Sequence, residues 1–149
     1  MSRNKIYVGP ADSATYKHHL VEGLAVDAIV PGTLVKQTAA GLATSDKAAT
    51  VFDSEALVAI EQGAHVGAEI TTAYTIGDTA MAAQARSGEF FLVSVAAAQN
   101  ITSKGVGLSS NGDGSLKIAA TDGTEQILFY SDEIVNTGGA AALVLVRKA

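Results

Sequence analysis

The sequence predicts an all-β protein, a small antiparallel β-sandwich or barrel with an extended N-terminal arm and little helix. Turn signals built from glycine, proline, asparagine and aspartate recur about every ten residues, and this spacing is typical of sandwiches and barrels. The apolar runs between these turns are short, as strands are. The one candidate helix, residues 80–85, is too short to be stable on its own.

Two segments of the chain share one layout. Gly32 precedes the apolar pair Leu34-Val35, and a second glycine, Gly41, follows Gly32 nine positions later. Gly105 is likewise followed by a short apolar stretch, a small polar loop and Gly114, again nine positions on. This pattern predicts a β-hairpin that is used twice and therefore a paired architecture.

The elements follow in order along the chain. Residues 1–20 show no sustained period and are assigned to the extended arm, whereas residues 21–149 are expected to form one β-barrel or sandwich domain. Run 90–97 is the most apolar and is expected to be the central strand. The turn at Asn111-Gly112 is a strong hairpin signal. The expected strands are 24–30, 33–38, 57–61, 69–74, 79–83, 90–97, 101–108, 116–120, 126–130 and 140–146.

The amino-acid composition predicts a core of small aliphatic residues. Of the 149 residues 48% are hydrophobic, but only 5% are aromatic and tryptophan is absent. Such a core buries little area per residue, so self-association is expected to add apolar burial. Cysteine is also absent, which excludes disulfides and thiolate metal sites and agrees with synthesis in a reducing cytosol.

The distribution of charge limits the kinds of partner. Residues 1–20 carry a net charge of +2, whereas residues 21–149 carry −7. An acidic body argues against nucleic-acid binding, which needs clustered cations. No apolar run is long enough for a membrane-spanning helix.

No cluster of residues predicts catalysis or metal binding. The turn after Ser109 resembles part of a calcium loop, but the first and twelfth positions hold Ser109 and Ala120 where carboxylates are needed. Adjacent His18 and His19 would point in opposite directions, and the one other histidine, His65, does not complete a tetrahedral set. No nucleophile elbow or phosphate-binding loop is present. We therefore expect neither an enzyme nor a protein with a metal or cofactor.

Neighbouring acids do not predict a glycosidase either. Asp53 and Glu55 form one such pair, and Asp132 and Glu133 form another. A glycosidase needs two carboxylates that face each other across a cleft, and neighbours in one loop do not supply that arrangement.

Several turn and strand motifs together resemble the head decoration proteins, or capsid cement proteins, of tailed bacteriophages. The resemblance covers roughly residues 20–149 and consists of turns and strand starts. Its motifs, in chain order, are Pro31-Gly32-Thr33-Leu34-Val35, Tyr74-Thr75-Ile76-Gly77-Asp78, Ile101-Thr102-Ser103-Lys104-Gly105-Val106-Gly107-Leu108, Asp113-Gly114-Ser115-Leu116 and Asp132-Glu133-Ile134-Val135 followed by run 142–146.

The resemblance implies a non-enzymatic virion protein on the outer surface of an expanded HK97-type capsid. Such a protein is made in the host bacterial cytoplasm, binds the major capsid protein where capsomers meet and helps the shell to resist the pressure of internal DNA. It also implies self-association, as a trimer or alternatively a dimer.

In that family the N-terminal arm commonly contacts the capsid. The capsid-binding residues expected here are Arg3, Lys5, Tyr7, Tyr16 and Lys17, while the acidic body faces solvent and other copies. Removing residues 2–19 is then expected to abolish capsid binding without unfolding the body.

A second hypothesis is a phage or cell-surface β-domain that binds a host glycan or receptor. Sugar sites usually use exposed tryptophan or tyrosine platforms. The absence of tryptophan and the presence of only four tyrosines count against this alternative.

Overall fold

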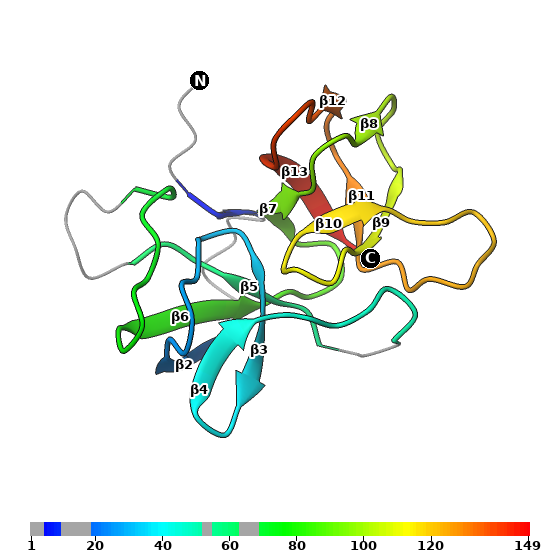
Figure 1. Cartoon of the computed structure of the whole chain (residues 1–149). Helices are drawn as coiled ribbons and strands as arrows, with labels where there is room; N and C mark the ends of the chain where they lie inside the picture. Colours follow the sequence, from blue (N-terminus) through cyan, green and yellow to red (C-terminus); the bar gives the residue numbers. More distant parts are fainter. Residues whose placement is uncertain (1–4, 10–18, 52–54, 63–68) are drawn as a thin grey trace.

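A computed structural model describes residues 5–9, 19–51, 55–62 and 69–149 of the chain (Figure 1). The described residues form strands, turns and loops and contain no helix, which confirms the all-β prediction. Most of the strand pairs are antiparallel. Two units are visible in Figure 1: a barrel at the upper right and a curled sheet at the lower left.

The barrel is a closed ring of five strands, in the order β7-β10-β9-β11-β13 and back to β7. Side chains on β7 alternate between the two faces, so Phe91, Val93 and Val95 point inward and are fully buried. The ring strands are β7 (Phe90–Val95), β9 (Gly107–Ser110), β10 (Leu116–Ile118), β11 (Phe129–Ser131) and β13 (Ala142–Lys148). The short strands β8 (Asn100–Ile101) and β12 (Val135–Asn136) pair at one end, and β1 (Tyr7–Gly9) pairs with β7.

The curled sheet has the order β2-β6-β5-β3-β4. Its strands are β2 (Leu20–Leu24), β3 (Leu34–Thr38), β4 (Gly41–Thr44), β5 (Leu57–Ala59) and β6 (Thr79–Gln84). A parallel bridge between Ala25 and Leu42 joins the end of β2 to β4. The Asp27 carboxylate accepts the backbone N–H of Thr44 at 3.0 Å. These contacts supply hydrogen-bond partners to the outer edge of β4. They also bring β4 toward the end of β2, so the sheet curls toward a second closed ring.

Two hydrophobic clusters fill these units, and one of them joins the units together. The first cluster combines the interior of the barrel with residues from the curled sheet, among them Leu34, Val58 and Ala83. The second lies within the curled sheet around Tyr74, whose hydroxyl donates to the Ile60 carbonyl at 2.8 Å. The shared first cluster fixes the barrel against the curled sheet.

The prediction of a hairpin used twice is confirmed. Strands β3 and β4 form one hairpin and β9 and β10 form the other. The four glycines of the pattern, Gly32, Gly41, Gly105 and Gly114, have φ values of 88°, 143°, 84° and 83°. The two hairpins also contact each other, because the Leu34 N–H donates to the Gly114 carbonyl at 2.7 Å.

Three of the expected strands are corrected. The expected strand 101–108 is split, because β8 ends at Ile101, a turn follows, and β9 begins only at Gly107. Residues 69–74 form a turn in which the Thr72 N–H donates to the Glu69 carbonyl, and of these residues only Tyr74 forms a β-bridge. Threonine and isoleucine favour strands only where a partner strand is present, and this segment has none beyond the bridge. The expected strand 24–30 is also wrong, because β2 ends at Leu24 and the chain then turns to bond β4.

Candidate interaction surfaces

The N-terminal strand β1 is anchored to both units. Glu61, which follows β5, accepts the Ile6 N–H at 3.1 Å and forms an ion pair with Lys5 at 3.2 Å. The Ile6 side chain is fully buried in the first cluster. Its carbonyl accepts the Leu92 N–H of β7 at 2.7 Å. Residues 5–9 are therefore part of the packed body.

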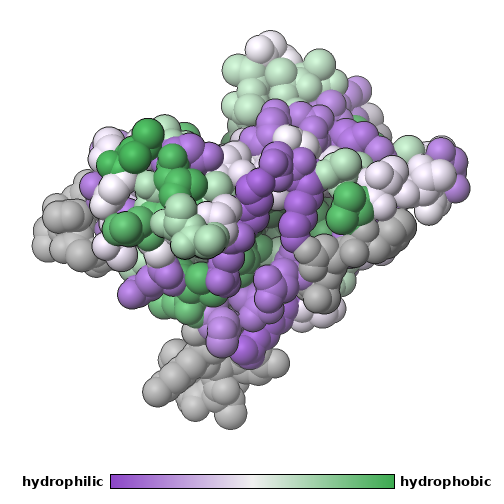
Figure 2. Space-filling model, turned by 60° about the horizontal axis from the view of Figure 1, so that its bottom comes forward, coloured by the Kyte–Doolittle hydropathy of each residue, from purple (hydrophilic) through white to green (hydrophobic). Residues whose placement is uncertain are grey.

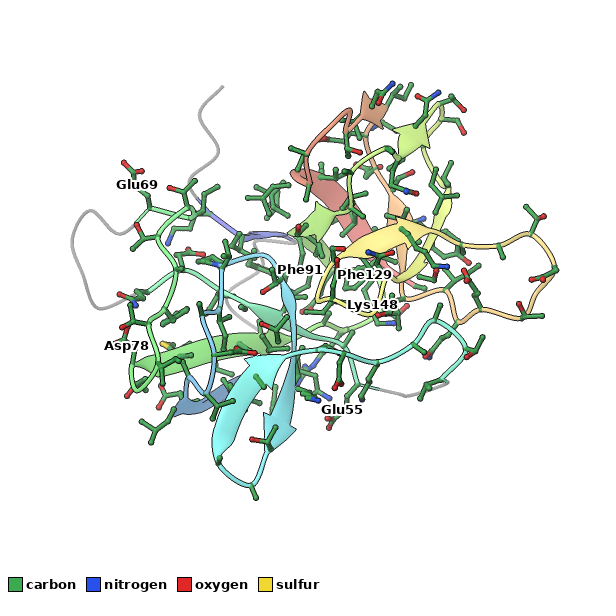
Figure 3. All side chains as sticks on the ribbon, in the orientation of Figure 1. Glu55, Glu69, Asp78, Phe91, Phe129 and Lys148 are labelled. Carbon is green, nitrogen blue, oxygen red and sulfur yellow. The ribbon has the colours of Figure 1, made fainter. Side chains whose placement is uncertain are left out.

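Tyr7 continues a row of aromatic contacts into the barrel. Its ring packs edge-on against the ring of Phe91, with 5.3 Å between the ring centroids. The rings of Phe91 and Phe129 pack in the same way, with 6.5 Å between their centroids. Burial and the nearby Glu89 carboxylate raise the pKa of Tyr7. Lys148 lies over the Phe129 ring at 5.9 Å from its centroid, and burial lowers the pKa of this lysine (Figure 3). These rings hold the barrel together where β1 joins it.

The five residues proposed for capsid contact divide into two groups. Lys5 and Tyr7 are described: Lys5 is 73% exposed but paired with Glu61, and Tyr7 is partly buried against Phe91. The other three residues, Arg3, Tyr16 and Lys17, lie outside the described residues. A deletion of residues 2–19 would remove Ile6 from the core, so it cannot separate capsid binding from folding.

A second surface lies on β2 and was missed by the sequence interpretation. We define the β2 face as Leu20, Glu22 and Leu24, which project outward from β2, together with Ile76 of the 75–78 turn. Leu20, Leu24 and Ile76 are 44%, 54% and 74% exposed. The turn lies beside β2, since the Gly77 N–H donates to the Ala25 carbonyl at 2.9 Å.

Alternation along β2 explains why these side chains are exposed. Val21 packs against the second cluster, and a Cβ at Gly23 would lie 3.2 Å from the Leu42 side chain, so both positions face inward. The residues between them must face outward. Figure 2 shows hydrophobic surface gathered on the left of that view, the side on which Figure 3 labels Asp78 of the same turn. The sequence carries no signal for this face, because the outward positions include two leucines while the inward positions are valine and glycine.

Two carboxylates lie at the β2 face. Glu22 projects from the middle of β2, and Asp78 belongs to the 75–78 turn. The Asp78 carboxylate accepts the N–H and hydroxyl of Thr75 at 2.8 and 2.7 Å, which orders this turn. Figure 3 labels Asp78 on the left of the molecule, on the same side as Glu69. The face thus combines aliphatic side chains with carboxylates.

A small cavity lies where the barrel meets the curled sheet. Its volume is about 30 Å³, and it is lined by Leu34, Leu57, Ser110 and Leu128 among others. This is enough for one or two water molecules and far below the size of a typical ligand pocket. Above it the Ser110 hydroxyl donates to the Lys47 carbonyl at 2.6 Å, which ties the second hairpin to the loop after β4.

A buried carboxylate closes the loop between β10 and β11. Glu125 is 10% exposed and forms an ion pair with Lys117. It also accepts the Ser109 hydroxyl and the Ala120 N–H, both at 2.8 Å. The Lys117 bond, followed by those from Ala120 and Ser109, lowers the pKa of Glu125 to about 2.

We expect Glu125→Gln to lower the free energy of unfolding by about 2 kcal/mol at neutral pH, because the buried hydrogen bonds lose their charged acceptor. The folded pKa is depressed, so this stabilisation is present above the unfolded value of about 4.5 and is lost as the pH falls through about 2. Urea unfolding at about pH 7 and about pH 3 measures this effect. The difference in free energy of unfolding between the wild type and Glu125→Gln should be roughly half as large at the lower pH. The matched control is Glu22→Gln, on an exposed carboxylate, and a pH-independent difference for Glu125→Gln would contradict the assignment.

Two further observations concern other classes of function. Within the described ranges, no three histidine or acidic side chains gather as they would around a metal ion. In the same part of the chain, no helix is long and apolar enough to cross a membrane.

Comparison with known proteins identifies no relative. No protein-family model matches the chain, and no curated protein matches its sequence.

Proposed function

We propose that the chain is a non-enzymatic structural protein of a bacteriophage virion. It binds the outer surface of an expanded HK97-type capsid where capsomers meet, and it stabilises the shell against internal DNA pressure. The observation that carries the proposal is the exposed aliphatic β2 face on a body with a closed barrel and a packed core that joins its two units. A cement protein needs a rigid body together with an exposed apolar surface that can bind the shell.

Rigidity matters because a cement protein must transmit load between capsid subunits. The barrel is closed, the outer edge of β4 is bonded by residues 26 and 27, and the two hairpins are joined at Leu34 and Gly114. A body that deformed easily would let the shell expand before it resisted. The closed architecture therefore supports a mechanical role.

The binding energy can come from many weak contacts. Several copies act together when the chain self-associates as a trimer, or alternatively as a dimer, and each copy adds its own contact with the major capsid protein. Because only the assembled, expanded shell presents these sites together, binding stabilises that form by mass action. The N-terminal segment that contains Arg3, Tyr16 and Lys17 is proposed to add a second contact.

Co-sedimentation with expanded and unexpanded capsids that lack decoration tests this function. We expect saturable binding to the expanded form at a fixed ratio to the major capsid protein, and weaker binding to the unexpanded form. Decorated capsids should also withstand higher temperature or chelator concentration before they release DNA. Failure to bind either form would overturn the proposal, and specific binding on a glycan array would favour the host-surface hypothesis.

A further inference from the structure

We propose that the β2 face is the surface that docks on the shell, and that its site on the major capsid protein combines aliphatic side chains with lysine or arginine. This inference rests on the proposed function and adds the docking surface and the chemistry of the partner. It also gives the acidic body a direct role in binding, in contrast to the expectation that this body faces solvent.

The first argument is that the fold leaves these side chains exposed instead of packing them in its core. Leu20 and Leu24 are 44% and 54% exposed, while the inward positions of β2 supply its contacts with the second cluster. Ile76 is 74% exposed at the tip of its turn, the highest value among the exposed large hydrophobic residues described. Aliphatic groups that are exposed together on one face gain free energy when a partner covers them.

The second argument concerns shape. Leu20 and Leu24 lie four residues apart on one extended strand, so they span about 13 Å along a nearly flat stripe. The 75–78 turn lies beside the end of that stripe, because the Ala25 N–H donates to the Asp78 carbonyl at 2.8 Å. A flat stripe with one projecting turn fits a broad protein surface better than it fits a small molecule.

The third argument concerns charge and identifies the partner. Glu22 lies between the two leucines and is itself exposed. Covering the stripe would remove water from this carboxylate, which is costly unless the partner supplies a cation. Among the described residues, no lysine or arginine forms an ion pair with Glu22. The partner must therefore place lysine or arginine against Glu22 and aliphatic groups against its neighbours.

The same charges disfavour a second copy of this chain as the occupant. If the face met itself across a two-fold axis, Glu22 of each copy would be brought into the same interface, together with other carboxylates. Like charges brought together in an interface oppose association. A capsid patch with the opposite charge avoids this penalty.

The test is co-sedimentation of variants with expanded, undecorated capsids. The double variant Leu24→Ser/Ile76→Ser should bind at least tenfold more weakly than the wild type. Ile134→Ser is the matched control, since Ile134 is 68% exposed but lies on the barrel near β12, and this variant should bind within twofold of the wild type. Circular dichroism and urea unfolding should show that all three proteins remain folded.

Charge variants test the partner's chemistry. Glu22→Lys should weaken binding about tenfold, and Glu22→Gln should bind more weakly with a smaller loss of affinity as the salt concentration rises. Stronger binding of Glu22→Lys would overturn the cationic partner.

The outcomes separate this inference from the function on which it rests. If the wild type binds and Leu24→Ser/Ile76→Ser binds equally well, the β2 face is not the docking surface, although the cement function stands. If the wild type binds neither capsid form, both proposals fail. If light scattering shows that the double variant loses an oligomer while each subunit still binds capsids normally, the face joins copies of the chain and the inference is wrong.

Discussion

Gly114→Ala is expected to lower the free energy of unfolding by about 3 kcal/mol. Gly114 has a φ of 83°, a conformation that costs an alanine about 1–2 kcal/mol. A Cβ at this position would also lie 2.5 Å from Cγ2 of Thr44 and 3.2 Å from the Leu34 carbonyl oxygen. The clash falls at the junction of the two hairpins, which carries the Leu34–Gly114 hydrogen bond. Urea unfolding followed by circular dichroism measures the loss.

Two other glycines distinguish the cost of the backbone conformation from the cost of the steric clash. Gly123 has a φ of 75° but no atom within 4 Å of a Cβ, so Gly123→Ala should show the backbone cost alone, about 1–2 kcal/mol. Gly139 has neither constraint, so Gly139→Ala should change stability by less than about 0.5 kcal/mol. Thr44→Ser removes the clashing methyl group and should restore part of the stability of Gly114→Ala. Equal losses for Gly114→Ala and Gly123→Ala would show that the hairpins do not meet as described.

Ile6→Ala is expected to destabilise the protein by about 3 kcal/mol, because removing most of a fully buried isoleucine leaves a cavity in the shared core. Val8 lies two residues further along the chain, in β1, but is 49% exposed. Val8→Ala should therefore change stability by less than about 0.5 kcal/mol. The comparison uses urea unfolding of both variants under one set of conditions.

The result decides where the N-terminal arm begins. A large loss for Ile6→Ala alone would mean that residues 5–9 belong to the body, and a binding test of the arm must then leave them in place. Substitution of Arg3, Tyr16 and Lys17 would replace the deletion as that test. If Ile6→Ala were as mild as Val8→Ala, β1 would not be docked in solution, and the original deletion of residues 2–19 would again separate binding from folding.

The β2 face and the N-terminal segment carry opposite charge, which has a consequence for assembly. Residues 1–20 have a net charge of +2, and the rest of the chain has −7. Under the proposed function, the N-terminal segment would meet an acidic patch of the capsid and the β2 face would meet a basic patch. Such two-point attachment across a junction would resist the separation of neighbouring capsomers.

The fold class and the paired hairpins could be predicted from the sequence alone. Both depend on local chemistry: glycine at positions with positive φ ends one strand and starts the next, and the continuous apolar run 90–97 marks a central strand. These signals act over a few residues, so they can be recognised without knowing what lies opposite. The same locality explains why 69–74 was predicted as a strand, since its composition favours one and only the missing partner forbids it.

Three features depend on contacts between distant parts of the chain: how the hairpins meet, where the arm ends and which surface remains exposed. The Leu34–Gly114 bond, the burial of Ile6 and the Glu61 anchor join residues 55 or more positions apart, and chain spacing carries no information about such contacts. The β2 face is the clearest case. Leu20 and Leu24 have the composition of core residues, and they are exposed because Val21 and Gly23 occupy the one side of β2 that the curled sheet covers.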